Sequence, residues 1–386
     1  MNPAIEIKNL SFSYGDTENQ LKHINLSVEK GEVIVLTGPS GSGKSTLTRV
    51  INGLIPYFFT GELSGEVWLF GKNMAEIPSW ERGKYVGNVF QDPRSQFFAN
   101  EVAGEIAFGC ENYGVPHDEI VKRVQDAAEA LSITNLLEQK VRYLSYGMRQ
   151  RVAIASAEAI DPEIYVMDEP SANLDIVSTY RFADIIHDLK KKGKTIIIAE
   201  HRLYYLRGLA DRFIYLAEGQ VSRDYSAAEF EQLTEQQRSN MGLRTFALER
   251  LLPPVLPQQE KTALALHNFR FAYKNEPETL HIMDCEIPTN RIVGIIGNNG
   301  AGKSTFSRCF CGLEKRCGEI VWNGRKYRPK DRLSTCYMVM QEVNHQLFTE
   351  SVLDEVLISM EEENQERAEE ILNRLDLLAF KDRHPM

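Results

Sequence analysis

The sequence predicts an α/β fold made of two similar domains in tandem, the second of them incomplete. The first observation is a glycine-rich loop, GPSGSGKST, that recurs later in the chain as GNNGAGKST. The second is that each loop follows a short apolar run and precedes a helical pattern. The third is that the segments flanking the loops recur in the same order, which is typical of a duplicated domain. A chain of 386 residues has room for two such domains.

The repeat continues along the chain with small insertions. Tyr14 precedes Lys44 by 30 residues, and Tyr273 precedes Lys303 by the same 30. The segment SGEVWLFGK recurs as CGEIVWNGRK, and QDPRSQFFANEVAGEI recurs as QEVNHQLFTESVLDEV. On this alignment the counterpart of LSYGMRQ would begin at about residue 388, beyond Met386.

The expected domain boundaries follow from the repeat. The first domain would span residues 1–225, and the N-terminal part of a second domain would span residues 262–386. The segment between them, residues 226–261, is polar and rich in Gln and Glu, and its PPVLP motif is typical of a semi-rigid linker. Within it, EFEQLTEQQ and ALERL are expected to form short helices.

Composition restricts the class of protein. The chain has 44 Lys and Arg against 54 Asp and Glu, so its net charge of -10 leaves no cationic excess, and nucleic acid is not an expected partner. No apolar stretch approaches the ~20 residues of a membrane span, and no signal peptide is recognisable, which predicts a soluble intracellular protein. Cys309, Cys311 and Cys317 could be metal ligands, but no second pair completes a site, so reduced thiols are expected.

Both glycine-rich loops have the spacing G-x-x-x-x-G-K-S, which binds phosphate groups. The apolar runs Val33–Thr37 and Ile292–Ile296 are the expected preceding strands. Main-chain N–H groups and the helix N-terminus would hold the phosphates, Lys44 and Lys303 would reach the β- and γ-phosphates, and the serines that follow would hold Mg²⁺. The expected nucleotide-binding residues are Gly38, Pro39, Ser40, Gly41, Ser42, Gly43, Lys44, Ser45 and Thr46, and Gly297, Asn298, Asn299, Gly300, Ala301, Gly302, Lys303, Ser304 and Thr305.

Two acids end an apolar strand in the segment EIYVMDEP. Asp168 would take part in the Mg²⁺ shell, and Glu169 would orient or deprotonate an attacking water. A strand that ends in Asp-Glu is more often a solvated turn, but its place after a phosphate-binding loop favours the catalytic interpretation. His201 follows the buried strand TIIIAE and could reach a γ-phosphate, although a lone histidine is usually structural.

Two further features have both a functional and an ordinary interpretation. Ser145 and Gly147 stand before a helical pattern, where they would form a second anion-binding corner or a simple helix N-cap. Tyr14 and Tyr273 are candidates for stacking on adenine or plain core aromatics, and their shared spacing favours the first interpretation.

Another pair of positions begins a polar and aromatic segment in each copy. These positions are Gln91 and Gln341. Phe97 and Phe98, which follow Gln91, could belong to the core or form an apolar docking surface.

Together these residues resemble the ATP-binding-cassette (ABC) ATPases across both repeats. The motif order carries the resemblance: aromatic loop Tyr14, Walker A Gly38–Ser45, Q-loop Gln91, signature Leu144–Met148, Walker B Asp168–Glu169, D-loop Ser171–Asp175 and switch His201. The resemblance implies an ATPase that uses ATP and Mg²⁺, with Glu169, His201 and Gln91 in catalysis. It also implies a set of metal-holding residues, namely Ser45, Gln91, Asp168, Ser304 and Gln341.

The stretch QDPRSQFF…EIAFGCENYG and the AEHR segment are similar to the subfamily that serves cobalt and energy-coupling-factor importers. This similarity implies a peripheral protein on the cytoplasmic face of the cell membrane. Its partners would be an integral membrane coupling (permease) subunit and a substrate-binding membrane subunit that selects the vitamin or metal.

The sequence departs from the family pattern in two ways. The signature LSGGQ reads LSYGM here, with Tyr146 and Met148 in place of Gly and Gln. In this family each signature caps the nucleotide of the other domain, so the altered copy would serve the Lys303 site, which also lacks its own Walker B acids and switch histidine within the given sequence. The Lys44 site has Asp168, Glu169 and His201 but lacks its partner signature. Either two chains pair through their first domains, or the sequence is a truncated product of a longer gene; we expect the second.

Two alternative functions remain open from the sequence. One is a non-catalytic nucleotide-binding fragment. The other is a soluble tandem ABC protein that acts on ribosomes or DNA, which the short and non-basic linker disfavours.

Overall fold

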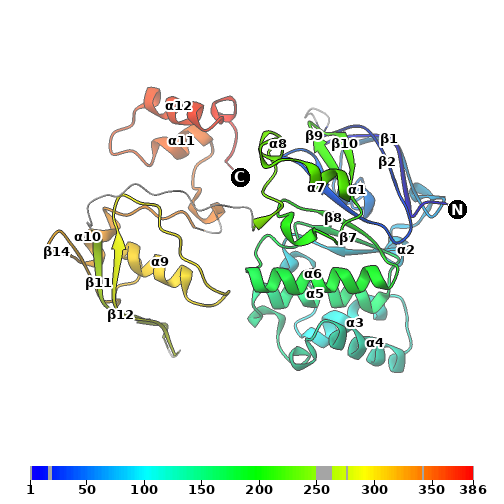
Figure 1. The fold of residues 1–386 in the computed structure, drawn as a ribbon, viewed down its shortest axis with the longest axis horizontal. Coiled ribbons are helices and arrows are strands. Elements are labelled where there is room, and N and C mark those ends of the chain that lie inside the picture. Colours follow the sequence, from blue (N-terminus) through cyan, green and yellow to red (C-terminus); the bar gives the residue numbers. More distant parts are fainter. Residues whose placement is uncertain (1, 16–19, 249–262, 275–276, 341–342, 386) are drawn as a thin grey trace. The chain divides into compact units, whose positions relative to one another are not determined.

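The computed structural model describes residues 2–15, 20–248, 263–274, 277–340 and 343–385 (Figure 1). The chain divides into two units, which are described separately. Within the described residues every helix is too short or too polar to cross a bilayer. The predicted α/β fold is confirmed in both units.

The first unit is built on a six-stranded sheet with the strand order β10-β9-β3-β8-β7-β6. Strands β9, β3, β8, β7 and β6 are parallel, and β10 is antiparallel to β9 at the edge. Strands β3 and β8 consist wholly of buried residues, as expected for parallel strands covered on both faces. The bounds are β3 Val33–Thr37, β6 Val86–Val89, β7 Ile164–Asp168, β8 Thr195–Ala199, β9 Arg212–Ala217 and β10 Gln220–Ser226.

Two layers cover this sheet. On one side, an antiparallel sheet of order β2-β1-β4-β5 and helix α1 (Lys44–Ile51) enclose a core of Ile, Leu and Val side chains. On the other side, helices α3 to α6 enclose a second core (Figure 1). The bounds are β1 Ile5–Ser13, β2 Leu21–Val28, β4 Glu62–Leu69, β5 Lys72–Asn73, α2 Ser79–Arg82, α3 Val102–Asn112, α4 His117–Ala130, α5 Tyr146–Ile160 and α6 Ile176–Lys191.

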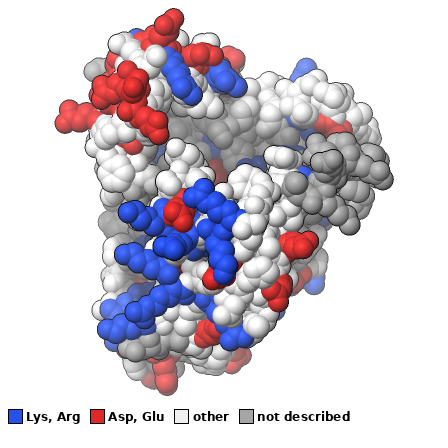
Figure 2. All heavy atoms as spheres, turned by 90° about the vertical axis from the view of Figure 1, so that its left-hand side faces the viewer, with Lys and Arg blue, Asp and Glu red and all other residues white. Residues whose placement is uncertain are grey.

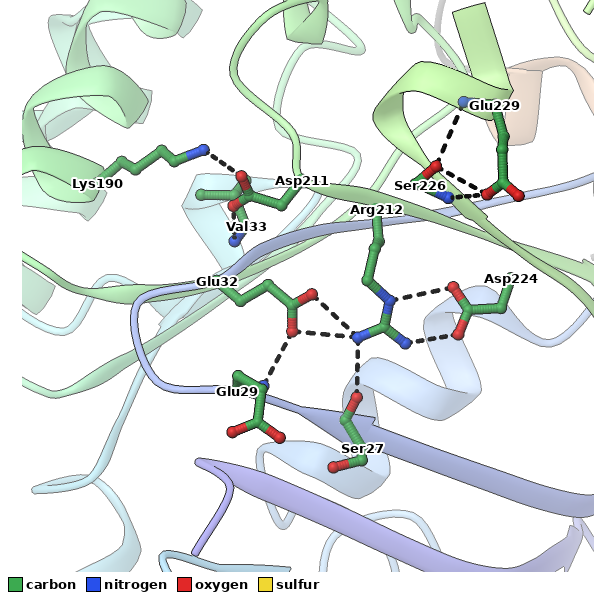
Figure 3. Close-up of polar contacts among 10 residues, drawn as sticks. All are labelled: Ser27, Glu29, Glu32, Val33, Lys190, Asp211, Arg212, Asp224, Ser226 and Glu229. Atoms are coloured by element: carbon green, nitrogen blue, oxygen red, sulfur yellow. Dashed lines mark hydrogen bonds and ion pairs between the residues drawn. The ribbon is translucent and has the colours of Figure 1, made fainter. Parts of the chain in front are cut away.

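Arg212, at the start of β9, ties several elements together at one end of the central sheet (Figure 3). Its guanidinium donates to Asp224 on β10 at 3.1 and 2.5 Å, to Glu32 before β3 at 3.0 Å and to the carbonyl of Ser27 on β2 at 3.0 Å. Such charge-assisted, two-pronged hydrogen bonds are directional. They fix the start of β3, whose other end carries the first glycine-rich loop.

A second contact in Figure 3 fixes β3 from the helical side. Asp211 accepts a hydrogen bond from the main-chain N–H of Val33 at 2.9 Å, and its other carboxylate oxygen lies 2.6 Å from Nζ of Lys190 on α6. The C-terminal end of α6 is thereby attached to the start of the strand that precedes the loop.

The segment predicted as a linker from residue 226 begins instead as part of the first unit. Helices α7 (Ala227–Gln232) and α8 (Glu235–Asn240) each start with a capping box, which stabilises a short helix. Phe230 is fully buried and stacks on Phe213 of β9 with ring centroids 4.1 Å apart. The predicted boundary at 225 is therefore wrong for the described residues up to 248. The PPVLP motif and most of ALERL lie outside the described residues.

The second unit repeats one layer of the first. Its antiparallel sheet has the order β12-β11-β13-β14, which matches β2-β1-β4-β5 strand for strand, and it packs on helix α9 (Figure 1). The bounds are β11 Ala263–Ala272, β12 Glu278–Pro288, β13 Glu319–Trp322, β14 Arg325–Tyr327, α9 Lys303–Cys311, α10 Pro329–Leu333, α11 Val352–Leu357 and α12 Gln365–Arg374. Cys309 and Cys317 belong to this small core, and no described group of three or more His, Cys, Asp and Glu residues is arranged to hold a metal ion.

The strand predicted over Ile292–Ile296 does not form. These residues have no regular structure, and Ile292 and Ile296 are almost fully exposed. In the first unit the equivalent strand β3 is held between β8 and β9. The described part of the second unit contains no counterpart of β8 or β9, so this apolar run has no strand to pair with.

Charge differs between the two copies of the hairpin. Residues 62–73 of the first copy contain two Glu and one Lys, whereas the aligned residues 315–326 contain one Glu and four exposed cations, namely Lys315, Arg316, Arg325 and Lys326. Figure 2 shows Lys and Arg side chains gathered on one face of the chain. The duplication has kept the fold of this hairpin and has changed its charge.

Candidate functional site

The first glycine-rich loop connects β3 to α1, and its conformation requires glycine. Gly38 and Gly43 have φ angles of 148° and 98°, and a Cβ atom on Gly38 would lie 2.1 Å from the carbonyl oxygen of Leu216. Nζ of Lys44 donates to the carbonyl oxygens of Gly38 at 3.0 Å and of Pro39 at 2.8 Å. The loop and its lysine are thus preformed as a cradle for an anion.

Lys44 is almost completely buried, with 4% of its surface exposed. Burial lowers the pKa of its ammonium group, while the nearby carboxylates of Glu169, Asp168 and Glu200 act in the opposite direction. The site therefore holds one buried cation, whose charge is complementary to a bound phosphate chain, next to carboxylates that can interact with a metal ion or a water molecule.

Ser45 and Asp168 bring oxygen ligands together below the loop. Oγ of Ser45 donates to Oδ1 of Asp168 at 3.0 Å, which joins the start of α1 to the end of β7. Burial raises the pKa of Asp168, and the Ser45 hydrogen bond and the cations Arg49 and Lys44 oppose that shift. A hydroxyl and a carboxylate at this spacing are the kind of hard oxygen donors that Mg²⁺ prefers, so these residues fit the ion.

Glu169 lies in contact with the other two predicted catalytic residues. Nε2 of Gln91 donates to its Oε2 at 3.2 Å, and Nε2 of His201 lies 3.5 Å from its Oε1. Glu169 adopts a left-handed conformation with φ of 43°, held by a hydrogen bond from its main-chain N–H to the carbonyl of Ala199 at 2.8 Å. Strained backbone of this kind is characteristic of functional sites.

The environment shifts the pKa values of this pair in opposite directions. Burial, followed by the charge of Glu200, raises the pKa of Glu169. Burial, followed by the charge of Lys44, lowers the pKa of His201 and favours its neutral form. A carboxylate with a raised pKa next to a neutral imidazole suits the transfer of a proton from water.

Glu200, which was not predicted as a functional residue, connects the loops around the site. Oε1 accepts hydrogen bonds from the main-chain N–H groups of His201 at 2.8 Å and Arg202 at 3.0 Å. Oε2 accepts from the N–H of Ser171 at 3.3 Å and from the hydroxyl of Tyr205 at 2.8 Å. A charged residue directly after the apolar strand TIIIA is the signal that could have identified it.

Arg202, also missed, holds the loop that follows β7. Its guanidinium donates to the carbonyl oxygens of Ser171, Ala172 and Leu174, each at 3.0 Å. The predicted D-loop is therefore fixed by side chains of the segment that carries His201.

Replacing Glu200 with Gln is expected to lower the free energy of unfolding by about 1–3 kcal/mol, because an amide NH₂ would face two donors in a buried pocket. Glu200 is 1% exposed. Chemical denaturation of the purified chain measures this loss, and the exposed turn variant Glu218→Gln serves as the matched control. Equal stability of both variants would contradict the role given to Glu200.

Tyr14 and Tyr273, which occupy equivalent positions in the two repeats, make the same contact through their hydroxyl groups. The hydroxyl of Tyr14 lies 3.4 Å from Oγ1 of Thr46, and that of Tyr273 lies 3.3 Å from Oγ1 of Thr305. Arg49 also donates to the Tyr14 hydroxyl at 3.1 Å. These contacts attach each ring to the helix that follows the loop; stacking on adenine stays a prediction.

The signature segment forms the start of α5. Ser145 is its N-cap and accepts a hydrogen bond from the N–H of Met148 at 3.4 Å, and Gly147 lies in the first turn. The hydroxyl of Tyr146 donates to the main-chain carbonyl of Gln91, and burial raises the pKa of this hydroxyl. Tyr146, one of the two residues that depart from the family signature, thus connects α5 with the loop that begins at Gln91.

The second loop has the backbone of the first. Gly297, Gly300 and Gly302 have φ angles of 156°, 83° and 89°, close to 148°, 78° and 98° in the first loop. Asn298, Asn299 and Ala301 complete it, and Lys303 begins α9. Ser304 is exposed, and the described second unit has no counterpart of Asp168, Glu169 or His201. The predicted ligand Gln341 lies outside the described residues.

Comparison with known proteins agrees with this geometry. The family model described as ABC transporter matches residues 21–172 and 280–386. Two proteins of Treponema denticola, each described as an ABC transporter ATP-binding protein, are 40% and 37% identical over 390 residues, covering 99% of this chain and 80% and 79% of their own lengths. A Methanosarcina mazei protein with the same description is 30% identical over 438 residues, covering 99% of this chain and 74% of its own.

Two solved structures share the fold of one cassette. That of cbiO1 from Clostridium perfringens, described as part of the ABC transporter complex cbiONQ, is 30% identical with a TM-score of 0.55 and covers 61% of this chain and 93% of its own. The ATP-binding cassette MJ0796, a dimer in a post-hydrolysis state with ADP and Pi, is 28% identical with a TM-score of 0.52 and covers 58% and 98%.

The fold and the site define an α/β ATPase with a phosphate-binding loop. The chain belongs to the ABC transporter family of ATP-binding proteins, whose members bind ATP.

Proposed function

We propose that this chain is the ATPase subunit of a membrane importer of the energy-coupling-factor type, which takes up a vitamin or a metal. The observation that carries the proposal is a groove of about 550 Å³ on the first unit, beside the loop that follows Gln91. The likeness to cbiO1, described as part of the complex cbiONQ, supports the same class of assembly.

The groove has a basic and partly apolar lining. Its residues include Arg94, Phe97, Lys140, Val141, Arg142 and Arg149. Arg94 forms an ion pair with Asp92 at 3.0 Å. Arg149 donates to the main-chain carbonyls of residues 141 and 142 at 3.4 and 2.9 Å. Arg142 donates to the hydroxyl of Tyr143 at 2.8 Å, and within the described residues neither Arg142 nor Lys140 forms an ion pair. The charges of these two exposed residues are the ones most suited to receive carboxylates from a short segment of a membrane subunit.

Gln91 connects the groove to the chemistry. Its side chain contacts Glu169, and the loop that it begins lines the groove through Arg94 and Phe97. A change in the bound nucleotide would first alter the positions of Glu169 and Gln91. The loop that begins at Gln91 would pass this displacement to the groove within a few residues. This is the short path that coupling of ATP hydrolysis to a membrane partner requires.

The chemistry at the first site follows from the residues described. Main-chain N–H groups of the loop and Lys44 bind the β- and γ-phosphates, and Glu169 accepts a proton from the attacking water while His201 and Gln91 position that carboxylate. Ser45 and Asp168 would hold Mg²⁺, together with Gln91, and the ion supplies neutralisation of phosphate charge. If two chains pair through their first units, Ser145 and Gly147 of one chain would complete the nucleotide site at Lys44 of the other.

The protein would be attached to the cytoplasmic face of the membrane through an integral membrane coupling subunit. A separate substrate-binding membrane subunit would select the cargo. The groove beside the loop that follows Gln91 would be the attachment point.

Reversing two charges tests the proposal. Lys140→Glu combined with Arg142→Glu is expected to reduce the membrane-bound fraction of the chain in its native cells several-fold, because both carboxylates would repel the partner segment. Flotation of membranes followed by immunoblotting measures the fraction, and ATPase activity of the purified variant should be unchanged.

The matched control is Lys122→Glu with Lys191→Glu, which reverses two exposed lysines on α4 and α6 away from the groove. It should leave the bound fraction as in the unchanged chain. An equal bound fraction for the groove variant and the control would contradict docking at this groove.

A further inference from the structure

The segment that follows α8 returns to the first glycine-rich loop. The hydroxyl of Tyr215 donates to the carbonyl of Met241 at 3.0 Å, and the N–H of Leu243 donates to the carbonyl of Arg238 at 2.9 Å. A Cβ atom on Gly242 would lie 3.3 Å from Cγ of Pro39 in the loop. Residues 241–243 therefore lie against the phosphate-binding loop.

The other end of this segment is anchored in the core. Phe246 is 3% exposed and packs edge-on against Phe213, at 5.6 Å between ring centroids, and against Phe230, at 5.3 Å. The buried guanidinium of Arg238 lies 5.2 Å from the same ring of Phe246. Arg244 is thus fixed between two anchors, each two residues away.

Arg244 is exposed, and its charge acts on both Glu169 and His201. For Glu169 burial is the larger influence and raises the pKa, while Arg244 lowers it. For His201 burial and Lys44 lower the pKa, and Arg244 adds to this effect. Within the described residues the guanidinium has no hydrogen-bond or ion-pair partner, so its donors are available to an anion.

We propose that Arg244 binds the terminal phosphate of ATP at the first site, as a second cation in addition to Lys44. Its segment touches the loop at Pro39, and its charge reaches the two residues assigned to the terminal-phosphate end of the nucleotide. A guanidinium presents paired donors that match the oxygens of a phosphate. This inference rests on the proposed roles of Glu169 and His201, and it places the segment after α8 inside the nucleotide site.

A contact to the terminal phosphate is lost in ADP, so Arg244 should distinguish the two nucleotides. Isothermal titration calorimetry with adenylyl-imidodiphosphate, as the non-hydrolysable analogue of ATP, and with ADP tests this on the full chain. The titrations use a Lys303→Ala background, so that the first site dominates binding.

We expect Arg244→Ala to weaken binding of the ATP analogue about tenfold and of ADP by no more than about twofold. Arg244→Lys should recover part of the loss, because a cation remains without the paired donors. Phe246→Ala, which removes the second anchor, should likewise weaken binding of the ATP analogue more than binding of ADP. Arg223→Ala, at an exposed position on β10, should change neither affinity.

Unchanged affinity for the ATP analogue in Arg244→Ala would overturn the inference. So would an equal loss for both nucleotides, because that is the result of a general disturbance of the loop. Such results would overturn the role of Arg244 but not the role of Glu169 in hydrolysis. The role of Glu169 is tested separately, because persistent ATP turnover in a Glu169 variant would contradict it.

Discussion

Replacing Glu169 with Gln is expected to reduce ATP hydrolysis by about 10³-fold while ATP binding persists. The amide can still accept the hydrogen bond from Nε2 of Gln91, which lies 3.2 Å from Oε2, so the shape of the site is kept. It cannot take a proton from water, which is the step that the raised pKa of the buried carboxylate favours. Release of inorganic phosphate and nucleotide titration measure the two properties separately.

Glu163→Gln is the matched control for this variant. Glu163 stands exposed just before β7, the strand that ends next to Glu169, and its carboxylate lies 3.8 Å from Nζ of Lys194. The control should retain turnover within about twofold, since surface ion pairs contribute little. Turnover in Glu169→Gln equal to that of the control would remove Glu169 as the catalytic base.

Replacing each loop lysine in turn is expected to separate the two sites. Lys44→Ala should lower ATP hydrolysis by about 10²-fold or more, because a preorganised cation at the phosphates is lost and the carbonyls of Gly38 and Pro39 lose their donor. Lys303→Ala should leave hydrolysis within about threefold. The carboxylates of Asp168 and Glu169 act on Lys44 of the first loop, and the described residues of the second unit include no counterpart of these two acids.

Steady-state ATPase assays on both variants measure this contrast, and each variant is the control for the other, since the same lysine is removed from two loops with the same backbone. Equal loss of activity in both would show that the second loop takes part in turnover. Equal retention would show that neither lysine is needed.

Local patterns in the sequence were sufficient for the loops and their lysines. The spacing of glycines predicted two phosphate-binding loops, and both loops form with matching φ angles. The equal distance from Tyr14 to Lys44 and from Tyr273 to Lys303 marked the two tyrosines as equivalent positions, and each hydroxyl lies beside the threonine two residues after the lysine. The loop conformations depend on neighbours close in sequence. The apolar run before the first loop was also predicted correctly as a strand, and it forms because β8 and β9 lie on either side of it.

The failures concern interactions between distant residues. Ile292–Ile296 has the composition of β3, but a strand needs partners, and the described second unit has none for it. The segment after residue 226 has the composition of a polar linker because it is rich in Gln and Glu. Two of its apolar residues, Phe230 and Phe246, are buried against Phe213 of β9, a partner distant in the sequence. The helix expected in EFEQLTEQQ is present as two short helices, α7 and α8, and the capping boxes at Ser226 and Thr234 are the sequence signal for their two separate starts.

The positions of Glu200, Arg202 and Arg244 could not be derived from sequence. Each lies near groups that are distant in the sequence, and only the fold determines which segments meet. Glu200, for example, joins the N–H of Ser171 to those of residues 201 and 202 across two strand ends.

The hydrogen bond from the Tyr146 hydroxyl to the carbonyl of Gln91 joins the first turn of α5 to the loop that lines the groove. The core that contains α3, α4 and α5 also contains residues of the central strands, so this bond adds a polar connection between the helical layer and the loop that begins at Gln91. We expect a movement of α5 to reach Gln91 through the Tyr146 hydroxyl and to change the contact of Gln91 with Glu169. The tyrosine that replaces a signature glycine would thus couple the helical layer to the geometry of hydrolysis through one side chain within one chain.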